Sequence, residues 1–176
     1  HAWAAHIPGV KVVLPSTAGE CKGLLKTAVR DNNPVMFFEH KMLYTTKFND
    51  VPEADEDVCI PFGKARIVTE GTDITVVANS MMTIKAEKAI RKLQKDGVSA
   101  ELIDLRTIVP LDTETIVRSV KKTGKLLIID EGHVSFGITG EIAARIMPEV
   151  FYDLEAPIER MGTSDVPLPF SPALEF

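Results

Sequence analysis

ITVVANSMMTIKAEKAIRKLQKDGVSAELIDL, residues 74–105, is the stretch from which we predict the fold class of this chain. Its two ends, 74–78 and 100–105, are mostly apolar, which is typical of strands buried on both faces of a parallel sheet. The segment between them is amphipathic at helical spacing, and Gly97 ends it as a C-terminal glycine ends a helix. The stretch therefore predicts a strand, a helix and a second strand parallel to the first.

The same alternation continues on both sides of this stretch. Further strands are predicted at 10–14, 35–38, 64–69, 126–130 and 157–160, and further helices at 18–30, 113–122 and 139–147. We expect the strands at 64–69 and 74–78 to form a hairpin that adds an antiparallel edge. With right-handed crossovers elsewhere, the pattern predicts an α/β fold, a Rossmann-like three-layer domain with a mostly parallel sheet.

Capping residues mark the ends of two predicted helices. Thr17, followed by Glu20 three residues later, forms a capping box at the start of the helix at 18–30. Asp112 and Gly124 bracket the helix at 113–122. The helix at 18–30 should bury an apolar stripe, whose members are Cys21, Leu24, Leu25, Ala28 and Val29.

The alternation stops between Glu39 and Pro61, where Asn, Pro and acidic residues replace the apolar pattern. Irregular segments longer than about 15 residues are uncommon inside a compact domain. We therefore divide the chain into 1–40, a linker at 41–61, and a second domain at 62–176. Because the chain opens without methionine and ends as abruptly, we expect a fragment of a longer protein.

Composition excludes several classes of function. The net charge is −5 and the pI about 5.4, which argues against a nucleic-acid-binding protein. No apolar run approaches the roughly 20 residues that a membrane span needs. Cys21 and Cys59 lie far apart in sequence and outside any CxxC pair, so we expect free thiols in an intracellular protein.

Three motifs allow a functional and a structural interpretation. The sequence lacks GxGxxG and GxxxxGK[ST], and the glycines of Phe136-Gly137-x-x-Gly140 more often permit close packing than bind an anion. The run Asp130-Glu131-Gly132-His133 ends a predicted strand and could transfer protons, but we favour a structural or interface role. His1 and His6 are five residues apart and would lie on different faces of a helix, which disfavours a metal pair.

Several segments, taken together and in order, resemble one family. They are AWAAHIPGVKVVLPST, KGLLKTAVRDNNPVMFFEHKMLY, IPFGKARIVTEGTDITVVA, AELIDLRTIVPLD and LEAPIERMGTSDVPLPFSPALE. The family is that of the beta subunits of the pyruvate, branched-chain 2-oxo acid and acetoin dehydrogenase complexes. Within this family, the sequence of these segments looks most similar to the bacterial pyruvate or acetoin members. One departure is Glu131-Gly132-His133, where many relatives read Glu-Ala-Pro.

The resemblance implies a transketolase-like subunit. Residues 1–40 would be the tail of a domain that binds the pyrimidine half of thiamine diphosphate, and 62–176 the transketolase C-terminal domain. It also implies a heterotetramer of two alpha and two beta subunits, in which the alpha subunit holds the diphosphate and magnesium. The catalytic histidine and the activating glutamate of the family fall upstream of His1. We therefore assign no catalytic and no cofactor-binding residue to this chain.

One binding site of the family matches residues of this chain. In several members the corresponding helix end binds potassium through main-chain oxygens, and the matching residues here are Ala28, Val29, Asp31 and Asn33. The alternative is an ordinary helix C-terminus, stopped by the Asn-Pro at 33–34.

The activity that the resemblance implies is thiamine-dependent oxidative decarboxylation of a 2-oxo acid, or cleavage of acetoin, with acyl transfer to a lipoyl acyltransferase. Taken alone, the chain should be inactive. The alternatives are a non-catalytic interaction module and another transketolase-like enzyme, such as a deoxyxylulose phosphate synthase. The compartment would be the cytoplasm of a bacterium or the mitochondrial matrix of a eukaryote, with no nucleic acid or membrane as partner.

Overall fold

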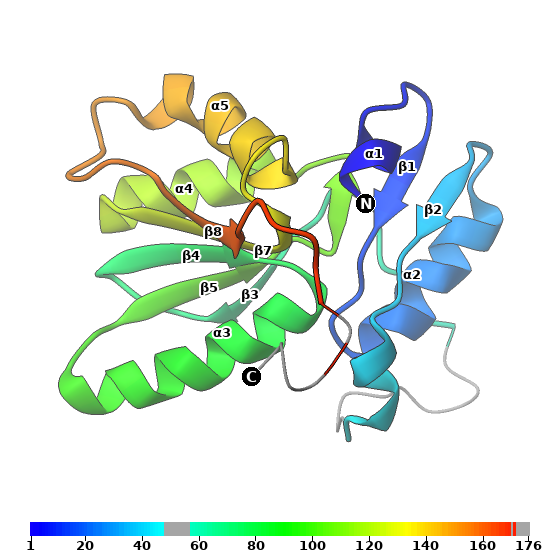
Figure 1. The fold of residues 1–176 in the computed structure, drawn as a ribbon, viewed down its shortest axis with the longest axis horizontal. Helices are drawn as coiled ribbons and strands as arrows, with labels where there is room; N and C mark the ends of the chain where they lie inside the picture. The colour runs from blue at the N-terminus through cyan, green and yellow to red at the C-terminus, as the bar shows by residue number, and fades with distance from the viewer. Residues whose placement is uncertain (48–56, 170, 172–176) are drawn as a thin grey trace.

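The computed structural model describes residues 1–47, 57–169 and 171, and these form two sheets (Figure 1). The three-stranded sheet has the order β2-β1-β6, and the five-stranded sheet has the order β3-β5-β4-β7-β8. The N-terminal elements are α1 (Ala2–Ala5), β1 (Lys11–Val13), α2 (Ala18–Arg30), β2 (Val35–Phe37) and the 3-10 helix η1 (Lys41–Thr45). β1 and β2 are parallel and α2 connects them, which confirms the strand-helix-strand unit predicted for this section.

The five-stranded sheet contains the predicted Rossmann-like arrangement. Its elements are β3 (Arg66–Thr69), β4 (Ile74–Ala78), α3 (Ser80–Leu93), η2 (Gln94–Asp96), β5 (Ala100–Asp104), α4 (Thr113–Thr123), β7 (Leu126–His133), α5 (Ile138–Val150) and β8 (Glu159–Thr163). β4 pairs in parallel with both β5 and β7, and β8 extends the sheet in parallel beyond β7. α3 lies on one face and α4 and α5 on the other, so the fold has three layers (Figure 1).

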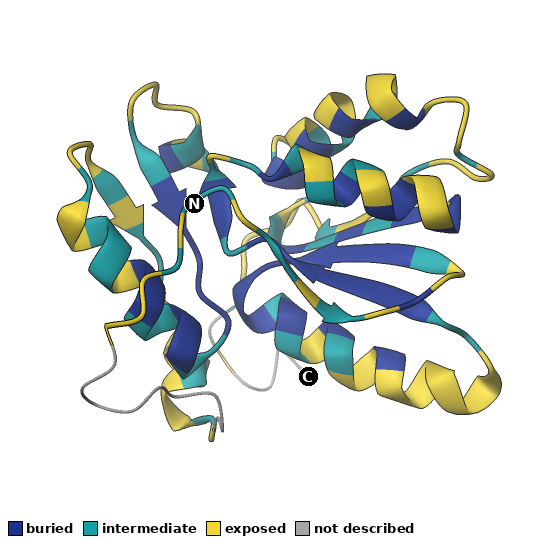
Figure 2. Ribbon diagram, turned by 180° about the vertical axis from the view of Figure 1, so that it is seen from behind, coloured by how far each residue is buried: buried dark blue, intermediate teal, exposed yellow. Residues whose placement is uncertain are grey.

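The alternating faces of the central strands explain these layers. Val77 and Ile103 belong to the core on the α4 and α5 side, whereas Val76 and Leu102 pack under α3. All four side chains are buried, so both faces of the strands are covered, as the apolar runs predict (Figure 2). Among the residues that the structure describes, none of the helices combines the length and apolarity that a membrane span requires.

The predicted hairpin of β3 and β4 is wrong. β3 is the expected antiparallel edge, but its partner is β5, and β4 lies at the centre of the sheet. Gly71 lies in the connection between β3 and β4 and packs against the backbone of Ala100, where a Cβ would come within 2.2 Å of the carbonyl carbon. The chain therefore passes the start of β5 before it enters β4, which lies between β5 and β7 and is buried at four of its five residues.

A strand that we did not predict links the two sections of the chain. β6 (Thr107–Val109) pairs antiparallel with β1, so the section after the linker contributes a strand to the three-stranded sheet. Its three residues are too few for a periodic signal. The domain division at 41–61 stays a prediction, since residues 48–56 of that linker lie outside the described part of the chain.

The predicted positions of the helices are confirmed, but the predicted burial of α2 is confirmed only in part. α2 begins and ends where predicted, and the Thr17 hydroxyl accepts a hydrogen bond from the Glu20 amide. However, Leu25 and Val29 of the expected apolar stripe are exposed, by 46% and 80%. The caps predicted for α4, Asp112 and a left-handed Gly124, are both confirmed.

Candidate functional site

The carboxyl ends of the central parallel strands face the N-terminal section of the chain. Asp104 ends β5, Asp130 lies near the end of β7, and Asn79 follows β4 directly. All three side chains are buried. Ligands of open α/β sheets usually bind at this edge, so it is the first place to look for a functional site.

Asp130 is held by three donors from different parts of the chain. His1 Nε2 lies 2.9 Å from its Oδ2, Asn79 Nδ2 donates to its Oδ1 at 2.9 Å, and the Gly132 amide donates to Oδ2 at 3.1 Å. Burial on its own would raise the pKa of Asp130, but the hydrogen bond and charge of His1, with the other donors, hold it below its usual value. The same hydrogen bond raises the pKa of His1 against the opposing effect of burial. The pair is therefore an ion pair at mildly acidic pH.

The rest of the Asp130–His133 run also contacts other parts of the chain. Glu131 Oε1 lies 2.9 Å from His40 Nε2, while His133 Nδ1 lies 2.8 Å from the Ser164 carbonyl oxygen. Two histidines of the N-terminal section thus pair with two consecutive acids of β7. These contacts within the chain agree with the structural alternative of the structural or interface role that the sequence favoured for the run.

A second cluster of buried charges lies beside the first and was not found from the sequence. Glu20 Oε1 lies 2.7 Å from Arg106 Nε and 2.8 Å from Arg66 Nε, and Asp104 lies 3.4 Å from the Arg66 guanidinium. Glu20 Oε2 also accepts from the Ser16 amide at 3.1 Å. The sequence alone places Glu20 in the capping box and indicates no second role for it. The signal that could have pointed to the cluster is Asp104 near the end of a mostly apolar segment, with Arg106 two residues after it.

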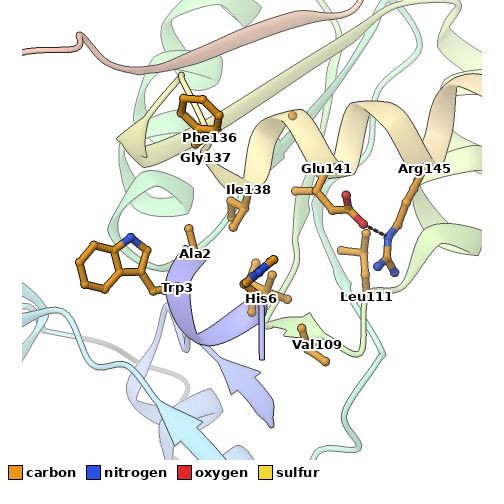
Figure 3. A pocket seen from close by; sticks show the side chains of 14 residues that line it. Ala2, Trp3, His6, Val109, Leu111, Phe136, Gly137, Ile138, Glu141 and Arg145 are labelled. Carbon is orange, nitrogen blue, oxygen red and sulfur yellow. Dashed lines mark hydrogen bonds and ion pairs between the residues drawn. The ribbon is translucent and has the colours of Figure 1, made fainter. Parts of the chain in front are cut away.

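A pocket of about 720 Å³ lies between α1 and the start of α5 (Figure 3). Its floor is apolar, formed by Ile108, Val109, Leu111, Ile138 and Ile142. The rings of Trp3 and Phe136 stand at its rim, exposed by 92% and fully, respectively. Gly137, the N-cap of α5, faces the carbonyl oxygen of His133, where a Cβ would lie only 2.0 Å away. That contact supports the packing role of this glycine.

The predicted potassium ligands lie where α2 ends. Arg30 is the last residue of α2, and Asp31 is its C-cap, whose amide donates to the Ala28 carbonyl at 3.2 Å. The Asp31 carboxylate accepts from the Asn33 amide at 2.9 Å and from the Lys11 ammonium, so it steadies the turn. Val29 is exposed on the last turn of the helix.

Other candidate ligands do not converge. His1 binds Asp130 while His6 lines the pocket at α1, so the structure separates the two histidines. Within residues 1–47, 57–169 and 171, no three His, Cys, Asp or Glu side chains gather in a way that could hold a metal ion. Both cysteines are free thiols.

Comparison with known proteins shows two domain families along the chain. Residues 63–175 match the family model of the transketolase C-terminal domain, and residues 1–47 match that of the transketolase pyrimidine-binding domain. A solved structure described as a split gene transketolase, an inactive beta4 tetramer, superposes with a TM-score of 0.77 at 26% identity. It covers 98% of this chain and 54% of the other.

Curated relatives align along almost the whole chain. The mitochondrial pyruvate dehydrogenase E1 component subunit beta of Dictyostelium discoideum is 46% identical over 99% of this chain and 49% of its own length. The corresponding subunit of Rickettsia felis is 50% identical over 97% of this chain and 52% of its own. The 2-oxoisovalerate dehydrogenase subunit beta of Bacillus subtilis is 45% identical, with the same coverage as the latter.

The chain spans about half the length of the curated relatives it matches. The match to the pyrimidine-binding domain comes first, at 1–47, and the match to the C-terminal domain follows, at 63–175. The three-layer arrangement of helices and sheet at 66–163 agrees with the match to the transketolase C-terminal domain. On this sequence match and this fold, the chain belongs to the transketolase family, with its residues 63–175 forming the family's C-terminal domain.

Proposed function

We propose that this chain is the C-terminal half of the beta subunit of a thiamine-dependent 2-oxo acid dehydrogenase component. The reaction would be oxidative decarboxylation of pyruvate or a related 2-oxo acid, or cleavage of acetoin, with acyl transfer to a lipoyl group. The observation that carries the proposal is the 45–50% identity to pyruvate and 2-oxoisovalerate dehydrogenase beta subunits over nearly the whole chain. We further propose that 1–40 and 62–176 are its two domain segments, joined by 41–61.

The buried polar residues at the carboxyl ends of the central strands do not fit a bound cofactor. Asn79, Asp104 and Asp130 are all buried, and each hydrogen-bonds or pairs with other residues of the chain. Thiamine diphosphate supplies the electron sink for decarboxylation, and the protein orients it. We therefore place the diphosphate and magnesium on the alpha subunit, with the ring-activating residues in the other half of the beta subunit. The packed core of this chain would hold the alpha subunit and the other half of the beta subunit in position.

The pocket at α1 and α5 is the surface on which we place a neighbouring subunit of the heterotetramer. Trp3 and Phe136 present two large exposed rings beside an apolar floor. Exposed aromatic clusters of this kind mark protein interfaces more often than free surface. Its occupant would be the alpha subunit, while the lipoyl acyltransferase would bind the assembled tetramer.

Replacing Trp3 and Phe136 with alanine in the intact beta subunit should weaken assembly with the alpha subunit more than tenfold, the size expected of interface aromatics. The matched control is Tyr152→Ala, since Tyr152 is equally exposed but lies outside the pocket. Sedimentation velocity over a concentration series measures the dissociation constant. Equal constants for the double variant and the control would refute this placement.

A potassium ion at the end of α2 is the second part of the proposal. The last carbonyls of a helix have no partner within the helix and carry the negative end of its dipole. Those of Ala28, Val29, Asp31 and Asn33 lie where the chain leaves α2, and that of Ala28 also accepts from the Asp31 amide. A large monovalent ion suits neutral oxygens of this kind better than magnesium, which demands tight octahedral geometry. The remaining ligands would come from the other half of the subunit.

The intact tetramer should therefore melt at a higher temperature in potassium than in choline at equal ionic strength. The rise should grow with potassium concentration, because an ion that binds only the folded state adds stability in proportion to the logarithm of its concentration. Differential scanning calorimetry measures it, with sodium as a test of size selectivity. Identical melting temperatures in all three salts would contradict the proposal of a potassium site.

Two other functions remain as alternatives. An interaction module without a reaction would assemble with the alpha subunit but support no turnover. A deoxyxylulose phosphate synthase shares the C-terminal domain, yet the relatives described above are 2-oxo acid dehydrogenase subunits. Those relatives are bacterial and mitochondrial, so the compartment would be the bacterial cytoplasm or the mitochondrial matrix.

Reconstitution separates these functions. The longer protein that contains this chain, purified with its alpha subunit, should acylate a lipoyl domain when given pyruvate, a branched-chain 2-oxo acid or acetoin, whereas residues 1–176 alone should not. Synthesis of deoxyxylulose phosphate instead would favour the second alternative. Assembly with the alpha subunit but without any turnover would favour the non-catalytic interaction module.

A further inference from the structure

The cluster of Glu20, Arg66, Asp104 and Arg106 joins the two sections of the chain. Glu20 belongs to α2 in the N-terminal section, while Arg66 lies on the edge strand β3 of the five-stranded sheet. Asp104 ends β5, and Arg106 lies in the short connection from β5 to β6. Residues from three separate parts of the sequence therefore meet at one buried point between the sheets.

The charges in this cluster are unevenly paired. Both guanidinium groups place their Nε close to the same oxygen of Glu20, at 2.7 Å for Arg106 and 2.8 Å for Arg66, but only Arg106 Nε donates a hydrogen bond to it. Asp104 is the more deeply buried acid, with no exposed surface, yet its guanidinium contact is the longer one at 3.4 Å. Its other oxygen accepts from the Arg106 backbone amide at 3.2 Å. The negative charge of Glu20 is thus closely paired with guanidinium groups, whereas a negative charge on Asp104 would be paired only at a longer distance.

The cluster lies on the connection that holds the sheets together. Arg106 adopts a left-handed backbone conformation, with φ of 59°, which is unusual for a residue other than glycine. In this conformation its carbonyl accepts from the Leu14 amide at 2.8 Å, and β6 follows it to pair with β1. The ion pair with Glu20 holds the same residue from its side chain. A change in the cluster's charge therefore acts directly on the contact between the sheets.

We propose that this cluster is a proton-controlled latch between the N-terminal section and the five-stranded sheet, closed when Asp104 carries a proton and loosened when it loses it. The charged groups that face Asp104 are Glu20 from α2 and Arg66 from β3, and the Ser16 side chain and the Arg106 amide face it as polar groups. The latch does not depend on the reaction that the whole protein catalyses.

The direction of the effect follows from the two states of Asp104. Burial, and next the negative charge of Glu20, raise the pKa of Asp104 to about 7 in the closed state, against the opposing effects of the Ser16 side chain, Arg66 and the Arg106 amide. In an opened, hydrated state an aspartate returns to about 3.9. Because the closed-state pKa is the higher one, protonation favours closing. The stabilisation is complete below about pH 4 and is lost as pH rises to 7, with no further loss above it.

Hydrogen exchange of the Leu14 amide tests the latch, because this amide donates across the junction to Arg106. After correction for intrinsic rates, its opening constant should rise by up to about tenfold per pH unit between pH 5 and 6.5 and level off above pH 7.5. The Val77 amide, within the five-stranded sheet, serves as the internal reference and should not follow this curve.

Asp104→Asn mimics the protonated acid at every pH and should abolish the rise. The matched control is Asp112→Asn, since Asp112 is also buried but caps α4 and has a lowered pKa, its backbone and side-chain donors outweighing burial. That variant should keep the wild-type curve. A flat wild-type curve would overturn the proposal, as would an unchanged curve in Asp104→Asn.

A direct titration keeps the test decisive if Asp104→Asn does not fold. The side-chain carboxyl carbon of Asp104, followed by NMR in uniformly ¹³C-labelled wild-type protein, should titrate near neutral pH. A midpoint at the ordinary aspartate value, about 3.9, would show that no proton is held there and would overturn the latch.

Discussion

Gly137→Ala should lower the free energy of unfolding of this chain by about 3 kcal/mol, at the upper end of the usual cost of overpacking. A Cβ at this position would lie 2.0 Å from the His133 carbonyl oxygen and 3.2 Å from the carbonyl carbon. Both are backbone atoms at the end of β7, so they cannot rotate away as a side chain would. The variant must therefore shift either the start of α5 or the end of β7.

Gly140→Ala, three residues further along, is the matched control. A Cβ there meets only the end of the Arg160 side chain at 3.2 Å, which can move. Because alanine favours the helix interior over glycine by about 1 kcal/mol, this variant should be neutral or more stable. Urea unfolding of both variants and the wild type measures the difference. If both replacements had the same effect, the close approach at Gly137 would not explain its presence.

Asp130→Asn should also destabilise the chain by about 3 kcal/mol, the lower end for breaking a buried ion pair. The carboxylate accepts from His1, Asn79 and Gly132, and a neutral amide would place its own N–H groups against some of these donors. Glu131→Gln is the control, because the Glu131 side chain is 41% exposed and its pair with His40 is solvated. Exposed pairs contribute less than about 1 kcal/mol.

The pH dependence identifies the ion pair as the cause. The raised pKa of His1 means that its protonated form stabilises the folded chain fully below the unfolded value, about 6.5, and that this contribution is lost as pH rises through the folded value. The lowered pKa of Asp130 adds stability above about 3.9, which is lost as pH falls through its folded value. Urea titrations of wild type and Asp130→Asn across pH 5–8 should therefore converge with rising pH. A constant gap across this range would assign the effect to something other than His1.

The sequence predicted most of this fold because its signals are local. Apolar runs such as 126–130 and caps such as Asp112 depend only on neighbouring residues, and both are confirmed. The pairing of β3 with β5 depends on a crossover past Gly71, which no local pattern records. β6 exists because β1 is there to pair with it, across more than 90 residues of sequence.

The site was predicted less well for the same reason. The Asp130–His133 run was recognisable, as a polar segment that ends an apolar strand. Its partners His1 and His40 were not, since they are 129 and 91 residues away from the acids they contact. Glu20 and Arg106 likewise pair across 86 residues. Capping explained Glu20 completely at the level of sequence, so nothing there pointed to a second role.

The central claim is that this chain forms the C-terminal half of a 2-oxo acid dehydrogenase beta subunit, and a chimera tests it most directly. Residues 1–176 would replace the matching half of a pyruvate dehydrogenase beta subunit that is 50% identical to them, and the product would be purified with that enzyme's alpha subunit. Release of carbon dioxide from [1-¹⁴C]pyruvate is then measured with and without thiamine diphosphate. The account predicts an assembled tetramer with thiamine-dependent release. A correctly assembled chimera that releases none, from pyruvate or from a branched-chain 2-oxo acid, would contradict it.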